Sequence, residues 1–233
     1  MTSSRDGADG PAESSPAGHG PTGDRPKKLH EYAQGWIGTL AGVAALALSI
    51  YNLVVLQQEP AVDVTLPHIA RVAQGKDTWL YLQPTLSTRL RTERVEIVTH
   101  VELRLRPVGG SVRAPAFFWD ETGSFSYDHT THRLTYERVA DPGPLVVAQG
   151  APQQPLLLFN AVGWNLAAGR YDGTLTFRRA SGQRPLRKRF CLVVSQGAAA
   201  TIREAQQYTF HDFRNDVPGS DPGRTGCYVL SPV

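Results

Sequence analysis

The stretch RVEIVTHVELRLR (94–106) alternates apolar and polar residues along its length. Successive side chains of a β-strand point to opposite faces, so this alternation predicts a long strand with one buried and one solvated face. The residues expected to face inward are Val95, Ile97, Thr99, Val101, Leu103 and Leu105, and those expected to face outward are Glu96, His100, Glu102, Arg104 and Arg106. One dry and one wet face are typical of an antiparallel sheet.

Short apolar segments separated by turn residues extend this β pattern along the chain. The further strand candidates are 62–66, 79–82, 116–119, 124–127, 133–139, 145–148, 156–160, 171–179 and 189–195. Glycine and proline clusters such as Gly109-Gly110 mark turns between them. This spacing predicts an all-β fold, an antiparallel β-sandwich over residues 58–197. Residues 198–233 are expected to pack on the sandwich as a helix followed by an extended tail.

The composition argues against several functional classes. With 24 Lys+Arg against 21 Asp+Glu, the net charge of +3 is too small to indicate a nucleic-acid binder. Two cysteines are too few for a Cys-rich zinc framework. The sequence has no Walker loop, no H-E-x-x-H pattern and no G-x-G-x-x-G after a predicted strand. We therefore expect a non-enzymatic protein without a cofactor.

An uncharged apolar segment precedes the β region. Residues 36–56, WIGTLAGVAALALSIYNLVVL, would form a helix about 31 Å long, which matches a hydrocarbon core of roughly 30 Å. The sequence therefore predicts a transmembrane helix over residues 35–57, with the lipid bilayer as the partner of residues 36–56. Residues 1–34 are polar and rich in Gly, Pro and Ser, and we expect them to be a disordered tail.

The flanking charges predict how this helix is oriented. Arg25, Lys27 and Lys28 precede the apolar segment, whereas the next basic residue after it is Arg71. Because basic flanks stay on the cytoplasmic side, we expect a single-pass signal anchor in the cell membrane, with a cytoplasmic N-terminus and an extracytoplasmic C-terminal domain. Gly38 and Gly42 form a G-x-x-x-G pattern, which would allow a homodimer; the alternative is that small residues are simply common in such segments.

One stretch carries a resemblance to known folds. Residues 166–177, LAAGRYDGTLTF, resemble the late hairpin of immunoglobulin-like and fibronectin-like modules, in which a tyrosine at a strand start anchors the corner through its hydroxyl. Tyr171 matches that position, with Gly169 before it, but no cysteine follows two residues later, so no antibody-type disulfide is implied. The overall layout, including VDVTLP (62–67) after the span, is similar to uncharacterised actinobacterial single-pass membrane proteins. The resemblance implies an Ig-like sandwich and no assigned chemistry.

Basic residues concentrate in one predicted hairpin. Its cations are Arg178, Arg179, Arg184, Arg187, Lys188 and Arg189, with no acidic residue between them. Because arginine forks match phosphate geometry, the hairpin is a candidate site for anionic lipid headgroups or an envelope polyanion; a solvated hairpin tip is the alternative. Asp128, His129 and His132 could supply metal ligands, but a polar hairpin turn is the more ordinary interpretation, and we assign no metal site.

The two cysteines are expected to pair. In the predicted strand 189–195, Cys191 lies opposite in phase to the apolar residues and would face outward, where the segment around Cys227 would cover it. Closing a loop of about 36 residues stabilises a domain by roughly 3–4 kcal/mol in the chain-entropy model. The alternative is two unrelated thiols in a reducing compartment.

Together these features predict a membrane-anchored, non-enzymatic β-sandwich module that binds or scaffolds an envelope protein or polyanion. One alternative is an envelope hydrolase or metal-dependent enzyme that uses Asp120, Glu121 or the turn with His129 and His132. Another is a reversed topology, with a cytoplasmic β domain in a membrane complex. The sequence does not identify the partner.

Overall fold

The computed structural model describes residues 28–89, 93–109, 113–130, 133–217 and 227–231. The chain divides into two compact units, Met1–Ile50 and Tyr51–Val233. Helix α1 (Lys28–Leu56) begins seven residues before the expected start at 35, because 28–34 contain no proline or glycine and continue the helix. Within it, Trp36–Leu56 is long and apolar enough to cross a membrane, with a mean hydropathy of 2.0. Residues 1–27 of the expected tail lie outside the described residues.

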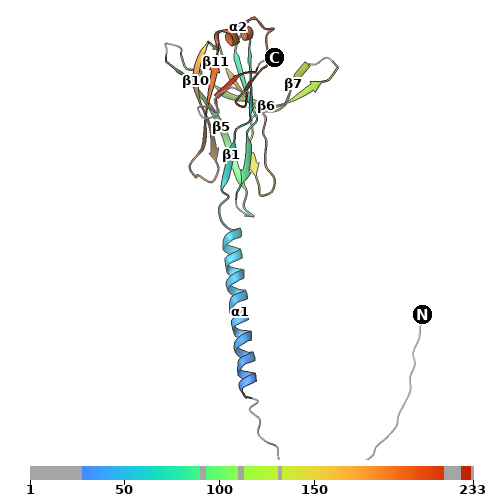
Figure 1. Cartoon of the computed structure of the whole chain (residues 1–233), viewed down its shortest axis with the longest axis vertical. Helices are drawn as coiled ribbons and strands as arrows, with labels where there is room; N and C mark the ends of the chain where they lie inside the picture. Colours follow the sequence, from blue (N-terminus) through green and yellow to red (C-terminus); the bar gives the residue numbers. More distant parts are fainter. Residues whose placement is uncertain (1–27, 90–92, 110–112, 131–132, 218–226, 232–233) are drawn as a thin grey trace, which may run out of the picture. The chain divides into compact units, whose positions relative to one another are not determined.

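The second unit is mostly β structure, as Figure 1 shows. Its elements are β1 (Val62–Thr65), β2 (Ile69–Gln74), β3 (Thr78–Leu82), β4 (Thr85–Thr88), β5 (Glu96–Val108), β6 (Phe118–Asp128), β7 (Arg133–Ala140), β8 (Leu145–Val147), β9 (Leu157–Ala161), β10 (Gly169–Arg179), β11 (Leu186–Val194), α2 (Gln196–Glu204), β12 (His211–Arg214) and β13 (Cys227–Leu230). The described strands form one large curled sheet, in the order β7-β6-β9-β3-β2-β12-β13-β11-β10-β5-β8, and a two-stranded sheet of β1 and β4. The prediction of a β-rich domain is confirmed.

Alternation within the strands builds the core. In β10, Tyr171, Leu175 and Phe177 are buried, and they pack with buried residues of β5, β9 and β11. The Tyr171 hydroxyl donates to the Ala167 carbonyl at 2.8 Å, four residues earlier in the chain. Gly173 is required where it stands, because a Cβ there would lie 2.3 Å from the Phe190 ring.

The alternation predicted for 94–106 holds only in its second half. Val101, Leu103 and Leu105 are buried, but Glu96 is buried at 2% exposure, whereas Ile97 is 37% exposed. The cause is a β-bulge: His100 pairs with Arg178 and Val98 with Arg179, so Thr99 has no partner and the phase of the strand reverses there. Val95, Ile97 and Thr99 are therefore exposed, against the prediction.

The C-terminal segment enters the sheet instead of packing over it. Ser195 caps α2, its hydroxyl accepting from the Ala198 amide at 3.0 Å. Beyond α2, β12 pairs antiparallel with β2, and β13 pairs parallel with β11. These two strands join the halves of the curled sheet, so the expectation of a tail covering the sandwich is corrected. An extended segment that lies between two unpaired strand edges can hydrogen-bond its backbone to both of them. A segment that packs on the face of a sheet makes fewer backbone hydrogen bonds.

Candidate anion-binding groove

The groove is formed by the outward face of three neighbouring strands, with β10 between β5 and β11. Strand register places outward residues in rows across the sheet. Thr174 lies opposite both Arg104 and Arg189, and Thr176 lies opposite both Glu102 and Arg187. Neighbouring strands are about 4.8 Å apart, so residues far apart in the sequence become direct neighbours here.

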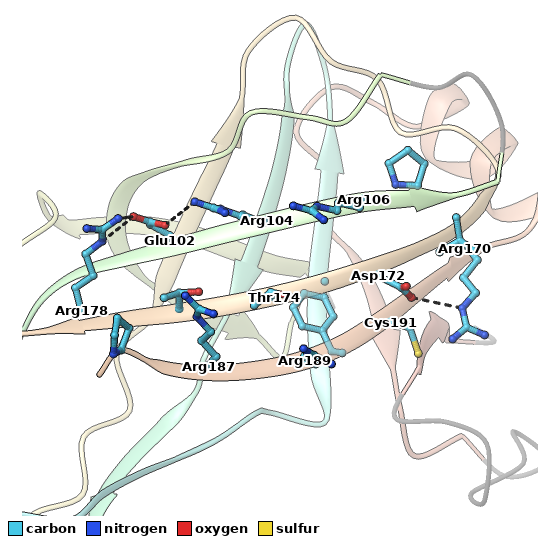
Figure 2. A pocket seen from close by; sticks show the side chains of 16 residues that line it. Glu102, Arg104, Arg106, Arg170, Asp172, Thr174, Arg178, Arg187, Arg189 and Cys191 are labelled. Atoms are coloured by element: carbon cyan, nitrogen blue, oxygen red, sulfur yellow. Dashed lines mark hydrogen bonds and ion pairs between the residues drawn. The ribbon is translucent and has the colours of Figure 1, made fainter. Parts of the chain in front are cut away.

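Most charged groups in this groove are arginines. It encloses about 1050 Å³, and Figure 2 shows the side chains around it. The cations that line it are Arg104, Arg106, Arg170, Arg178, Arg187 and Arg189. The acidic residues that line it are Glu102 and Asp172. Thr174 lies between Arg104 and Arg189, and Thr176 lies between Glu102 and Arg187. Six cations against two carboxylates give the lining a strong positive excess.

The two carboxylates bind only part of this charge. Glu102 pairs with Arg178 at 2.5 Å and with Arg104 at 3.4 Å. Asp172 pairs with Arg170 at 3.7 Å. Within the described residues, no ion pair engages the remaining three groove arginines, which are Arg106, Arg187 and Arg189. These guanidinium groups offer donors in a planar fork that suits phosphate, sulfate or carboxylate.

The structure divides the six predicted hairpin cations. Arg178, Arg187 and Arg189 line the groove, and Arg184 lies exposed in the turn outside it. The other two have structural partners. The Arg179 guanidinium lies 3.8 Å from the buried Glu96 carboxylate and donates to the Arg184 carbonyl at 2.6 Å.

Lys188 binds the carboxylate of Asp63 at 3.1 Å, and Arg89 binds the same carboxylate at 2.5 Å. These two cations lower the pKa of Asp63 to about 2, with the hydrogen bond from Arg89 as the largest cause. Lys188 is therefore a structural cation of the inward face rather than part of the groove.

Three groove arginines were missing from the predicted site, namely Arg104, Arg106 and Arg170. The alternation of 94–106 did place Arg104 and Arg106 on the outward face. What the sequence did not show is that β5 lies beside β10, and only that pairing adds these arginines to the hairpin.

Cys191 and Cys227 are joined by a disulfide, the pairing expected from the sequence. Their Cα atoms are 4.3 Å apart, because β11 and β13 place the two residues directly opposite each other. Cys191 also lines one end of the groove, so the bond fixes β11, the strand that carries Arg187 and Arg189. Both cysteines are buried. Cys191 lies opposite Asp172 on the outward face of the sheet, the face predicted for it.

The candidate metal and enzyme residues are dispersed. The Asp128 carboxylate accepts from the Thr130 amide at 2.8 Å, the His129 ring packs against Tyr127, and His132 lies outside the described residues. Asp120 accepts from Asn160 at 3.4 Å, and Glu121 pairs with Arg138 at 3.1 Å. No group of three metal-ligating side chains occurs in the described part of the chain.

The candidate dimer glycines, Gly38 and Gly42, lie on an open part of α1. A Cβ added at either position would meet no atom within 4 Å. The helix therefore leaves this small-residue face accessible, and its pairing stays a prediction. In comparisons with known proteins, the chain matches no family model, no curated protein and no solved structure.

Proposed function

We propose that this protein is a membrane-anchored, non-enzymatic β module that holds a polyanionic partner at the cell envelope. The observation that carries the proposal is the groove on β5, β10 and β11, in which Arg106, Arg187 and Arg189 have no ion pair among the described residues. A ligand that carries several anionic groups would satisfy these donors together. Thr174, next to Arg189, and Thr176, next to Arg187, add neutral hydrogen-bonding groups.

The proposed location rests on three features. Trp36–Leu56 has the length and hydropathy of a single membrane span. Arg25, Lys27 and Lys28 before it favour a cytoplasmic N-terminus. A Cys191–Cys227 disulfide persists best in an oxidising compartment, which favours an extracytoplasmic β domain. The Tyr171–Ala167 contact supports an immunoglobulin-like arrangement of that domain.

Binding of labelled inorganic polyphosphate to the full-length protein tests the proposal. The protein is placed in nanodiscs of neutral lipid, and affinity is measured by fluorescence anisotropy. The double substitution Arg187→Gln and Arg189→Gln removes two forked donors, and we expect it to weaken binding by about tenfold or more. Added salt should weaken binding of the unmodified protein, because the groove is open to solvent.

The matched control removes the same charge elsewhere. Lys76 and Arg203 are exposed and outside the groove, so Lys76→Gln with Arg203→Gln should leave affinity within about twofold. Equal losses in the two double variants would show a general charge effect and would contradict a site in the groove.

A further inference from the structure

The segments around the end of α1 are tied to two loops of the β domain. The Leu56 carbonyl accepts from the Glu93 amide at 3.2 Å, and the Ala61 carbonyl accepts from the Arg89 amide at 3.0 Å. The Glu59 carboxylate accepts from the side chain of Gln183 in the β10–β11 turn. All of these residues belong to the unit Tyr51–Val233. The start of β5 and the β10–β11 turn therefore lie beside the residues that directly follow the helix.

The length of chain between the helix and these contacts is short. Glu59 is three residues beyond Leu56, and three extended residues span at most about 11 Å. If α1 crosses a bilayer, as the proposed function requires, this end of the β domain is held close to the headgroup layer.

Exposed apolar side chains gather at this same end. Ile97 and Val146 are direct partners in the β5–β8 pair and are 37% and 50% exposed. Val95, just before β5, is 51% exposed. The Ile97 carbonyl accepts from the Ala180 amide at 2.8 Å, which places this patch at the β10–β11 turn. The bulge at Thr99 is the cause, because it turns Ile97 outward and Glu96 inward.

Exposed basic residues lie at the rim of this patch. Arg94 precedes Val95, and Arg184 lies in the β10–β11 turn, next to Gln183. Glu93 and Glu59 supply carboxylates at this end, so the local charge is balanced rather than strongly positive. Apolar residues flanked by arginines are the pattern of surfaces that rest in a membrane interface, with the apolar groups at acyl-chain level and the guanidiniums at phosphate level.

We propose that Val95, Ile97 and Val146 form a contact surface for the bilayer itself, with Arg94 and Arg184 at the lipid phosphates. This inference rests on the membrane anchoring in the proposed function. Its consequence is that the β domain is fixed against the membrane instead of moving freely above it, so that the arginine groove, on the neighbouring part of the same strands, has a set height over the lipid.

Depth-dependent quenching in nanodiscs tests this contact. A cysteine replaces Pro185, which is exposed in the turn, and carries an environment-sensitive fluorophore; the native cysteines are held in their disulfide. The control label replaces Val108, which is also exposed but at the opposite end of β5. With lipids that carry a quencher just below the headgroup, we expect quenching at position 185 to exceed that at 108 by about twofold or more, because quenching requires near contact.

Substitutions then separate contact from mere proximity. Ile97→Asp with Val146→Asp should reduce quenching at 185 to the level at 108, whereas Val162→Asp, at a more exposed valine elsewhere, should not. Equal, low quenching at 185 and 108 in the unmodified protein overturns the inference. If that result is accompanied by two copies of the protein in each disc, the patch is assigned to contact with a second copy. A protein that does not enter nanodiscs at all refutes the anchor of the proposed function instead.

Discussion

The β10–β11 hairpin carries cations on both of its faces, and the two faces use them differently. Arg179 and Lys188 point inward, where Glu96 and Asp63 neutralise them. Arg178, Arg187 and Arg189 point outward; of these three, only Arg178 has an acidic partner among the described residues, Glu102. The partner carboxylates come from strands distant in sequence, so a charge count along the hairpin mixes structural cations with cations available for a ligand. The difference teaches that strand phase, not charge density, selects the candidate site.

Loss of the disulfide should have the largest effect on stability. Cys191 borders the outward groove, but its bond to Cys227 stabilises the domain. Replacing both cysteines, Cys191→Ser with Cys227→Ser, should lower the free energy of unfolding by about 4 kcal/mol, since it opens a loop with a sequence separation of 36. Urea unfolding of the full chain measures this loss. Non-reducing mass spectrometry should show a linked Cys191–Cys227 peptide pair, and two freely alkylated thiols would contradict the bond.

Breaking the inward ion pair should have the next largest effect. Glu96→Gln leaves the guanidinium of Arg179 buried beside a neutral group, which costs about 3 kcal/mol and lowers Tm by roughly 6–12 °C. Thermal unfolding followed by circular dichroism measures the change. At temperatures below thermal unfolding, the affinity for polyphosphate should be unaltered. A loss of affinity in this variant would contradict the separate roles of the inward and outward faces.

Asp63 predicts a smaller, pH-dependent effect on the inward face. Its folded pKa of about 2 lies below the ordinary value of 3.8, so its contribution is complete above about pH 4 and is lost as the pH falls towards 2. Because the pair is partly open to solvent, we expect Asp63→Asn to cost only about 1 kcal/mol at neutral pH. Unfolding curves of both proteins should converge near pH 2; a constant difference down to that pH would assign the loss to packing.

The outward arginines should have the smallest effect on stability. Arg187→Gln with Arg189→Gln is expected to change the free energy of unfolding by less than about 0.5 kcal/mol, because neither side chain has an ion pair among the described residues. The same urea titration measures it. A loss comparable to that of Glu96→Gln would show that these side chains are structural and would remove the distinction between the faces.

Local patterns in the sequence predicted the parts of the fold that depend on neighbouring residues. The alternation in 94–106 and 171–179 identified β5 and β10, and the candidates 116–119 and 124–127 fall in or next to the single strand β6. The disulfide was predicted from the outward phase of Cys191 and from an apolar segment around Cys227 that could lie against that strand. The strand predictions needed no knowledge of which strands pair.

The features that the sequence did not predict depend on contacts between distant residues. The bulge at Thr99 arises from the register of β5 against β10. The sequence does not reveal it, because the alternation of apolar and polar residues continues through Val95 and Ile97. Likewise, the groove needs β5 beside β10, and the place of β13 needs the free edge of β11. The hairpin sequence therefore predicted three of the six arginines that line the groove, and the other three were not predicted.

The central place of β13 also constrains how the domain is made. The strand that connects the β2 half to the β11 half comes from residues 227–230, after every other described strand has been synthesised. A nascent chain consequently leaves the edges of β12 and β11 open until these residues emerge, and open edges invite pairing with other chains. Completion of the sheet must therefore follow synthesis of all the other described strands, so a chain halted before Cys227 would be a substrate for chaperones and proteases rather than a shorter working protein.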